Sequence, residues 1–201
     1  QDEDIVVAQR RKYLRLAKQL DLRPGDRVLE IGCGWGGFAE IAAAEFGCHV
    51  VGVTLSAEQA AFAQDRMVRA GLKAKVDIRI QDYRDVEGQF DKIASIEMFE
   101  AVGEKFWPTY LEILKARLKP GGKAALQIIT IDDAQFENYR SNPDFVQRYI
   151  FPGGMLPGEK MFAGAVSAAG LNVCDTFFFG PSYAETLRRW DQDFQHNWPG
   201  I

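Results

Sequence analysis

The sequence predicts one α/β domain in which a mostly parallel sheet is flanked by helices. Short apolar runs alternate with amphipathic segments, at spacings that suit right-handed crossover connections. The chain has 201 residues, somewhat more than the ~150 residues used as a guide for one domain. Hydrophobic residues make up 47% and charged residues 26%, as in globular proteins. We therefore treat residues 1–201 as a single domain.

The first expected element is an amphipathic helix over residues 5–20. Its buried stripe is predicted from apolar residues at helical spacing, namely Tyr13, Leu16, Ala17 and Leu20. Basic residues lie between them. They suit either a solvated face, balanced by the acidic residues 2–4, or contact with a membrane surface.

The remaining elements continue the alternation. Strands are expected at residues 28–31, 49–53, 76–80, 92–96, 124–129 and 171–179. Helices are expected at residues 36–46, 57–70, 106–118, 159–169 and 183–194. A turn with two glycines, at residues 119–122, precedes the fifth strand. The sequence thus predicts six strands.

Residues 131–157 interrupt this alternation and are too long for a simple loop. Among prolines and glycines they carry large side chains, namely Tyr139, Phe145, Tyr149, Phe151 and Met155. Insertions that follow the carboxyl end of a strand border the ligand crevice in sheets of this kind. We therefore expect the insertion 131–157 to cover the substrate.

The composition restricts partners and location. A net charge of −4 provides no overall positive field, which argues against nucleic-acid binding. Three scattered cysteines predict neither a disulfide scaffold nor a metal site, and they favour the reducing cytoplasm. No apolar run approaches the ~20 residues of a membrane span, so we expect any membrane contact to be peripheral. The chain begins with Gln1, which is expected of a piece of a longer polypeptide.

A glycine-rich sequence, EIGCGWGG at residues 30–37, joins the first strand to the next helix. Its G-x-G-x-x-G spacing fits a dinucleotide, whereas Glu30 with a glycine at every second position fits S-adenosylmethionine. A nicotinamide site normally has an acid at the end of the second strand, and residues 53–56 contain none. Glu30 also suits a cationic sulfonium better than a pyrophosphate. We predict binding of S-adenosylmethionine or S-adenosylhomocysteine in preference to NAD.

Asp82 and Tyr83 follow the third strand and offer a second contact for such a donor. An acid and an aromatic ring at this place can hold adenine by a hydrogen bond and by stacking. A position in the hydrophobic core is the alternative for Tyr83.

Taken together, five segments of the chain resemble the cyclopropane-fatty-acyl-phospholipid synthase and mycolic acid cyclopropane synthase family. They are EIGCGWGGF at residues 30–38, GVTLSAEQ at 52–59, QDYRD at 81–85, SIEMFEAVG at 95–103 and YIFPGGMLP at 149–157. The resemblance implies a Rossmann-like class I methyltransferase fold. It also implies methyl transfer from S-adenosyl-L-methionine to the double bond of an unsaturated fatty acyl chain in phospholipid. Sheets of that fold end with an antiparallel seventh strand, and nothing strand-like follows residue 179, so we expect this strand to be absent here.

The resemblance also implies which residues bind the donor. The methionine end would contact Gly32 and Gly34 beside Glu30, and the ribose and adenine would contact Thr54, Gln59, Asp82 and Tyr83. Either Thr54 or Ser56 can instead cap the following helix, a role that is compatible with binding.

Methyl addition to an alkene leaves a carbocation, which requires carboxylates, aromatic faces and a base. Glu97 and Glu100 follow the fourth strand, in an aromatic neighbourhood. The resemblance implies that Glu100, Tyr183 and the backbone of Ile129 hold a bicarbonate ion that acts as the base. The alternative to a catalytic role for the two glutamates is that they stabilise the N-terminus of a helix. The alternative for Tyr183 is a structural role in the hydrophobic core.

One departure from the family concerns the base. Cyclopropane synthases usually have a histidine in the fifth strand, where this chain has Gln127, and His49 and His196 lie outside the motifs. A neutral amide binds an anion less strongly than a cationic donor does. We therefore expect an altered bicarbonate site, and methyl or methylene branching becomes a rival to ring closure.

Two other functions stay open at this point. Coclaurine-type N-methyltransferases have a segment similar to residues 95–100, which would fit a small amine or isoprenoid substrate. The second is a module that binds the donor but has lost catalysis. The intact motif glycines and Glu100 argue against it.

Overall fold

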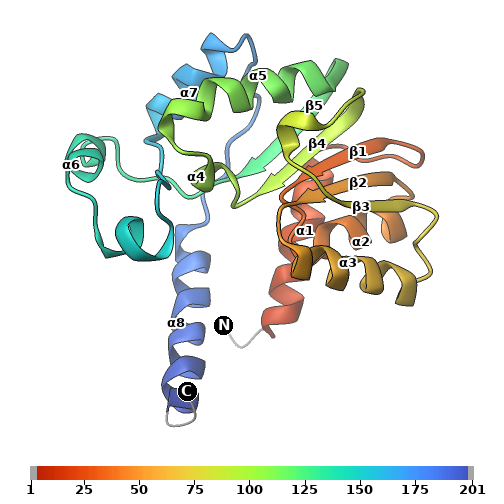
Figure 1. Ribbon diagram of the computed structural model, residues 1–201, viewed down its shortest axis with the longest axis horizontal. Helices are drawn as coiled ribbons and strands as arrows, with labels where there is room; N and C mark the ends of the chain where they lie inside the picture. The colour runs from red at the N-terminus through yellow and green to blue at the C-terminus, as the bar shows by residue number, and fades with distance from the viewer. Residues whose placement is uncertain (1–3, 199–201) are drawn as a thin grey trace.

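Five parallel strands form one sheet at the centre of the molecule (Figure 1). The computed structural model describes residues 4–198. The strand order is β3-β2-β1-β4-β5, so the direction in which strands are added reverses between β1 and β4. The strands are β1 (Arg27–Ile31), β2 (His49–Thr54), β3 (Val76–Ile80), β4 (Phe90–Ile96) and β5 (Leu118–Gln127). This arrangement confirms the predicted α/β fold with a parallel sheet.

Helices cover both faces of the sheet (Figure 1). One face carries α1 (Ile5–Gln19), α2 (Gly37–Glu45) and α3 (Ala57–Arg69). The other carries α4 (Phe99–Val102), α5 (Trp107–Arg117) and α7 (Glu159–Ala168). The expected helices are confirmed, with α4 as an addition before α5.

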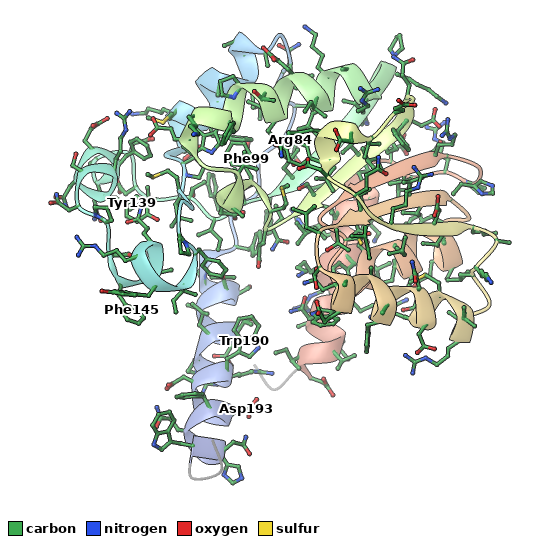
Figure 2. The ribbon with its side chains drawn as sticks, viewed as in Figure 1. Arg84, Phe99, Tyr139, Phe145, Trp190 and Asp193 are labelled. Carbon is green, nitrogen blue, oxygen red and sulfur yellow. The ribbon has the colours of Figure 1, made fainter. Side chains whose placement is uncertain are left out.

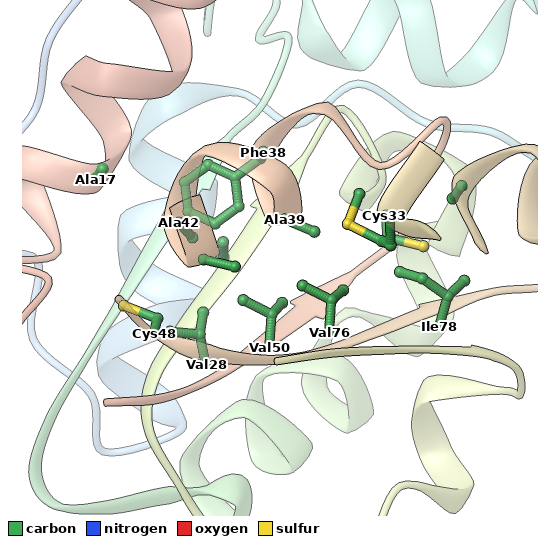
Figure 3. Packing of buried hydrophobic residues seen from close by; sticks show 14 of the residues in the cluster. Ala17, Val28, Cys33, Phe38, Ala39, Ala42, Cys48, Val50, Val76 and Ile78 are labelled. Atoms are coloured by element: carbon green, nitrogen blue, oxygen red, sulfur yellow. The ribbon is translucent and has the colours of Figure 1, made fainter. Parts of the chain in front are cut away.

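The strand residues alternate between two hydrophobic cores, as the period of two in a strand requires. Val28 packs in the core beneath α1, α2 and α3, whereas its neighbour Leu29 packs in the core beneath α5 and α7. Figure 3 shows the first core, in which Val28 and Val50 lie below Phe38 and Ala42 of α2. The sheet is therefore buried on both sides, as expected for parallel strands.

The predicted turn at residues 119–122 lies inside β5 and not before it. Leu118 pairs with Phe90, and the next paired residue of β5 is Lys123, opposite Lys92. The intervening residues bulge out of the ladder, and Gly121 has a φ of 78°, a conformation that glycine adopts without strain.

The sixth predicted strand, at residues 171–179, is absent, so the prediction of six strands is wrong. This segment forms no ladder with any described strand and instead crosses α1. Gln19 donates a hydrogen bond to Asp175 at 3.1 Å, and the Arg15 guanidinium lies 3.2 Å from the centre of the Phe177 ring. An apolar β-branched run becomes a strand only where a neighbouring backbone is available to pair with it.

The cysteines show the same difference between the two ends of the chain. Cys48 is buried, as expected of a core residue, and Cys33, the small residue between the motif glycines, is buried too. Cys174 was expected in a buried strand, but it is exposed because its segment does not join the sheet. Between residues 4 and 198 the sheet contains no antiparallel strand, which agrees with the expected absence of the seventh strand.

The insertion 131–157 forms a lobe beside the sheet (Figure 1). Its base is closed, because the amide of Ile131 donates to the carbonyl of Pro157 at 3.0 Å. It contains α6 (Phe136–Ser141) and a short π-helical segment, η3 (Val146–Ile150). Next to it, α8 (Gly180–Asn197) extends away from the sheet with no buried residue.

None of the helices between residues 4 and 198 has both the length and the apolar character required to cross a membrane.

Candidate functional site

Most of the predicted site residues lie at one edge of the sheet, where the carboxyl ends of the strands meet. Three of them lie at the end of β1, namely Glu30, Gly32 and Gly34. The ends of β2 and β3 carry Thr54, Asp82 and Tyr83. The ends of β4 and β5 carry Glu97, Glu100, Gln127 and Ile129. Ligands of open α/β sheets bind at this edge, where the strand order reverses. The sequence motifs therefore converge on the place that the topology favours for a ligand.

The motif glycines have different structural roles. A Cβ at Gly32 would lie 2.9 Å from the Met98 side chain, and one at Gly36 would lie 3.0 Å from Ala63, so both allow close packing. Gly34 has a φ of 52°, and a Cβ there would have no neighbour within 4 Å. The backbone of Gly34 therefore faces open space, where a bound molecule can approach it.

Glu30 is an unusual buried acid, only 2% exposed. The amide of Ala39 donates to its carboxylate, while Oε2 has no hydrogen-bond partner among the described residues. Burial raises the pKa of Glu30 to about 8, an effect that the Ala39 hydrogen bond and the charges of Arg66 and Lys12 oppose. A cationic group of a ligand would provide the compensation that this carboxyl lacks.

Thr54 and Gln59 meet at the end of β2, where the resemblance places the ribose. The Thr54 hydroxyl donates to the Gln59 side-chain oxygen at 2.8 Å. The Ser56 hydroxyl accepts from the amide of Gln59 at 3.1 Å and caps α3. Ser56 is therefore the helix cap, and Thr54 Oγ1 accepts from the backbone amide of Ser56 at 3.2 Å.

Asp82 and Tyr83 lie beyond β3, and both already have protein partners. Arg84 donates to the Asp82 carboxylate at 2.6 Å, and this hydrogen bond lowers the pKa of Asp82. The half-buried Tyr83 ring packs edge-on against Tyr110, with 5.3 Å between the ring centres. Tyr83 thus borders the core on one side, and an adenine would have to contact its other side.

Glu97 and Gln127 form a pair that links the ends of β4 and β5. The Gln127 amide donates to the Glu97 carboxylate at 2.6 Å, and the Glu97 backbone amide donates to the Gln127 carbonyl at 2.8 Å. Gln127 is buried, whereas Glu97 is exposed. The Gln127 amide group, expected from the sequence to face an anion, therefore donates to a carboxylate of the protein.

Glu100 lies in the first turn of α4 and joins three segments. The backbone amide of Ile129 donates to Glu100 Oε1, while Oε2 is buried without a partner among the described residues. Burial raises the pKa of Glu100. The Glu100 carbonyl accepts from the amide of Met155 at 2.8 Å, which attaches the insertion 131–157 to the site.

Tyr183, in the first turn of α8, reaches this group. Burial raises the pKa of its phenol, and the negative charges of Glu97 and Glu100 raise it further. The structure thus brings the catalytic candidates Glu100, Gln127, Ile129 and Tyr183 into one neighbourhood, together with Glu97.

One residue of α1 was missed from the sequence. Lys12 lies one turn before Leu16 and next to Tyr13, so it borders the predicted buried stripe of α1. Partial burial lowers the pKa of Lys12, and the charges of Glu97 and Glu30 counteract this shift. The signal was the helical spacing, which should have separated Lys12 from the other basic residues of α1.

The donor set suits an organic cofactor. Between residues 4 and 198, no cluster of histidine, cysteine and acidic side chains could hold a metal ion. The open backbone at Gly34 and the unpartnered oxygen of Glu30 fit a molecule with a positive charge. S-adenosylmethionine carries such a charge on its sulfonium and amino groups, so the residues present fit it.

Comparisons with known proteins agree with this geometry. Residues 1–201 match the family model described as mycolic acid cyclopropane synthetase. The tuberculostearic acid methyltransferase of Mycobacterium tuberculosis is 41% identical over 98% of this chain and 46% of its own length. The cyclopropane-fatty-acyl-phospholipid synthase of Escherichia coli is 40% identical over 99% of this chain and 50% of its own length. The chain spans about half the length of these curated relatives.

A solved structure shows the same fold. The crystal structure of a mycolic acid cyclopropane synthase complexed with SAH and CTAB superposes with a TM-score of 0.89 at 28% identity. The match covers 98% of this chain and 72% of that one.

Proposed function

Because this chain belongs to the mycolic acid cyclopropane synthetase family, we propose that its protein is a methyltransferase that modifies unsaturated fatty acyl chains. The methyl group comes from S-adenosyl-L-methionine, and the acceptor is a double bond in a phospholipid acyl chain. The observation that carries the proposal is the convergence of the glycine loop and a pair of carboxylates at one edge of the sheet.

The residues beyond β1 to β3 would hold the donor. When bound, S-adenosylmethionine supplies an electrophilic methyl group on a positively charged sulfur. Glu30 offers a buried carboxyl group that would lose its proton when the cationic end of the donor binds beside it, and the open backbone of Gly34 permits close approach. Thr54 and Gln59 are available for the ribose, and Asp82 and Tyr83 for the adenine.

The segments after β5 suit an apolar acceptor. In the insertion 131–157, large side chains in η3 and just before it are exposed, including 70% of Tyr149 and 66% of Phe145. Trp190 on the neighbouring α8 is also exposed, and Figure 2 shows it on the same side of the molecule as Phe145. Such a surface fits an acyl chain and peripheral contact with the membrane that contains it. We propose that the insertion 131–157 covers the substrate.

The carboxylates next to this surface would stabilise the reaction. A methyl cation added to an alkene leaves a positive charge on the neighbouring carbon. Glu100 is held by Ile129 close to Glu97 and Tyr183, so its negative charge can act on that carbon. The buried rings of Phe99 in α4 and Trp107 in α5 stack with 5.3 Å between their centres and exclude water from the inner side.

A branched product is the outcome that the Gln127 contact favours. A bicarbonate ion would need donors, but the Gln127 amide and the Ile129 amide both donate to carboxylates of the protein. An anion would also face the charges of Glu97 and Glu100. We therefore propose methyl or methylene branching rather than ring closure, with bicarbonate bound weakly or displaced.

Lipid mass spectrometry of cells that express the full-length protein tests this function. We expect a mass gain of one CH₂ on monounsaturated phospholipids, and NMR of the purified product will distinguish a branch from a ring. An exclusively cyclopropane product would contradict the branching proposal, and comparison with Gln127→His would show whether this residue decides it. If no lipid changes and a small amine is methylated instead, the protein belongs to the alternative substrate class and the lipid proposal is wrong.

A further inference from the structure

Glu97 has a backbone conformation that its side chain does not favour. Asp21 and Glu97 are the non-glycine residues with positive φ between residues 4 and 198, and Glu97 has a φ of 50°. Aspartate is common in this conformation, but glutamate is not, and such strain concentrates at functional sites. Glycine would adopt this φ freely, so a requirement other than backbone geometry must explain a carboxylate here.

The side chain of Glu97 is held in one orientation. The buried Gln127 amide donates to its carboxylate at 2.6 Å, while the Gln127 carbonyl accepts from the Glu97 amide at 2.8 Å. Two contacts to one residue fix both the backbone and the carboxylate of Glu97. Glu97 as a whole is exposed, so its carboxylate is held at the surface and not in the core.

The surrounding charges distinguish Glu97 from Glu100. Glu100 is partly buried, and its Oε1 accepts from the Ile129 amide. Glu97 is exposed, and its negative charge raises the pKa of Lys12 and of Tyr183. A group that removes a proton must also release it, and Glu97 is the more exposed of the two residues.

We propose that the Glu97 carboxylate is the base that takes the proton from the methylated acyl chain. The inference rests on the function proposed above. Methyl addition to the double bond leaves a carbocation on the neighbouring chain carbon. A C–H bond of the added methyl group or of a neighbouring carbon then breaks, its proton goes to a Glu97 oxygen, and its electron pair forms a double bond or a ring bond. Glu97 becomes a neutral acid and returns the proton to water, so that no oxidant or reductant is required.

Gln127 is a positioning residue in this scheme. Its amide orients the Glu97 carboxylate without placing a positive charge beside it. A protonated histidine at this place would instead form a stronger, charge-assisted bond to the carboxylate.

The kinetic test compares three variants of the full-length protein on a monounsaturated phospholipid. Glu97→Gln keeps the shape and the contact with Gln127 but loses the base, and we expect turnover to fall by about 10²-fold or more with donor affinity unchanged. Glu97→Gly relieves the positive φ and opens space, so formate added in solution should restore part of its turnover. Glu112→Gln, an exposed acid on α5, is the matched control and should behave as the wild type.

A binding experiment needs no turnover. A long-chain secondary amine, charged near the middle of the chain, mimics the cationic intermediate, and a long-chain ether is its neutral counterpart. In calorimetry, Glu97→Gln should weaken binding of the amine about tenfold and leave binding of the ether unchanged. Equal effects on the two ligands would indicate a structural role and would contradict the proposal.

The outcomes separate this inference from the proposed function. A wild-type protein that does not methylate the phospholipid overturns both. If the wild-type protein methylates the phospholipid and Glu97→Gln has the same turnover, only the assignment of Glu97 as the base is overturned. Loss of turnover in Glu97→Gln with formate rescue of Glu97→Gly supports both.

Discussion

Two helices, α2 on the donor side and α8 on the acceptor side, differ in where they place their large apolar side chains. On the donor side, Phe38 of α2 is 1% exposed in the core under the sheet. On the acceptor side, Trp190 of α8 is 50% exposed, and no residue of α8 is buried. Contacts within the chain therefore hold α2 in place, whereas α8 presents apolar groups that we propose are for a lipid.

Removing one large side chain from each helix gives the largest expected contrast. Phe38→Ala should lower the free energy of unfolding by about 3–5 kcal/mol, because it leaves a cavity in a packed core. Trp190→Ala should change it by less than about 0.5 kcal/mol. Urea denaturation of both variants measures the difference, and equal losses would show that α8 packs against the body in solution.

Removing the negative charge of Glu100, which lies between the donor side and the acceptor side, should give the next largest effect. Glu100→Gln can keep its hydrogen bond from Ile129 but loses the negative charge. In the full-length protein we expect turnover to fall by about 10²-fold or more, with little change in donor affinity. A parallel loss of donor affinity would place Glu100 in the donor site, contrary to our proposal.

Two glycines test whether the donor side is built for a ligand. Gly34 and Gly121 both have positive φ and open space at the Cβ position, but only Gly34 lies in the motif. Each alanine substitution should cost about 1–2 kcal/mol of stability through backbone strain. Only Gly34→Ala should also weaken donor binding in calorimetry. Equal affinities in the two variants would remove Gly34 from the site.

The pH dependence of stability tests the buried acid of the donor side. With a pKa near 8 when folded and about 4.5 as its ordinary value, Glu30 keeps its proton in the folded state while the unfolded chain loses it. Stability should therefore fall as pH rises between these values, by at most about 1.4 kcal/mol per pH unit. Glu30→Gln should lack this slope in urea titrations at pH 5 to 8, and identical slopes would show that Glu30 is ionised.

The sequence predicted the donor side better than the acceptor side, for a physical reason. Strands β1 to β4 and their helices follow local periodicity, and the motif glycines have recognisable spacing. Residues 171–179 also have an apolar pattern, but pairing depends on a neighbour that local sequence does not reveal. The contact between Glu97 and Gln127 joins residues far apart in the chain. Only the register of β4 and β5 brings them together.

The most direct test of the account is calorimetric titration of the protein with S-adenosylhomocysteine and, separately, with NAD. The open backbone at Gly34, the buried carboxyl group of Glu30 and the lack of an acid at residues 53–56 predict binding of S-adenosylhomocysteine and none of NAD. Tight binding of NAD with no response to S-adenosylhomocysteine would contradict the donor site and, with it, the proposed methyl transfer.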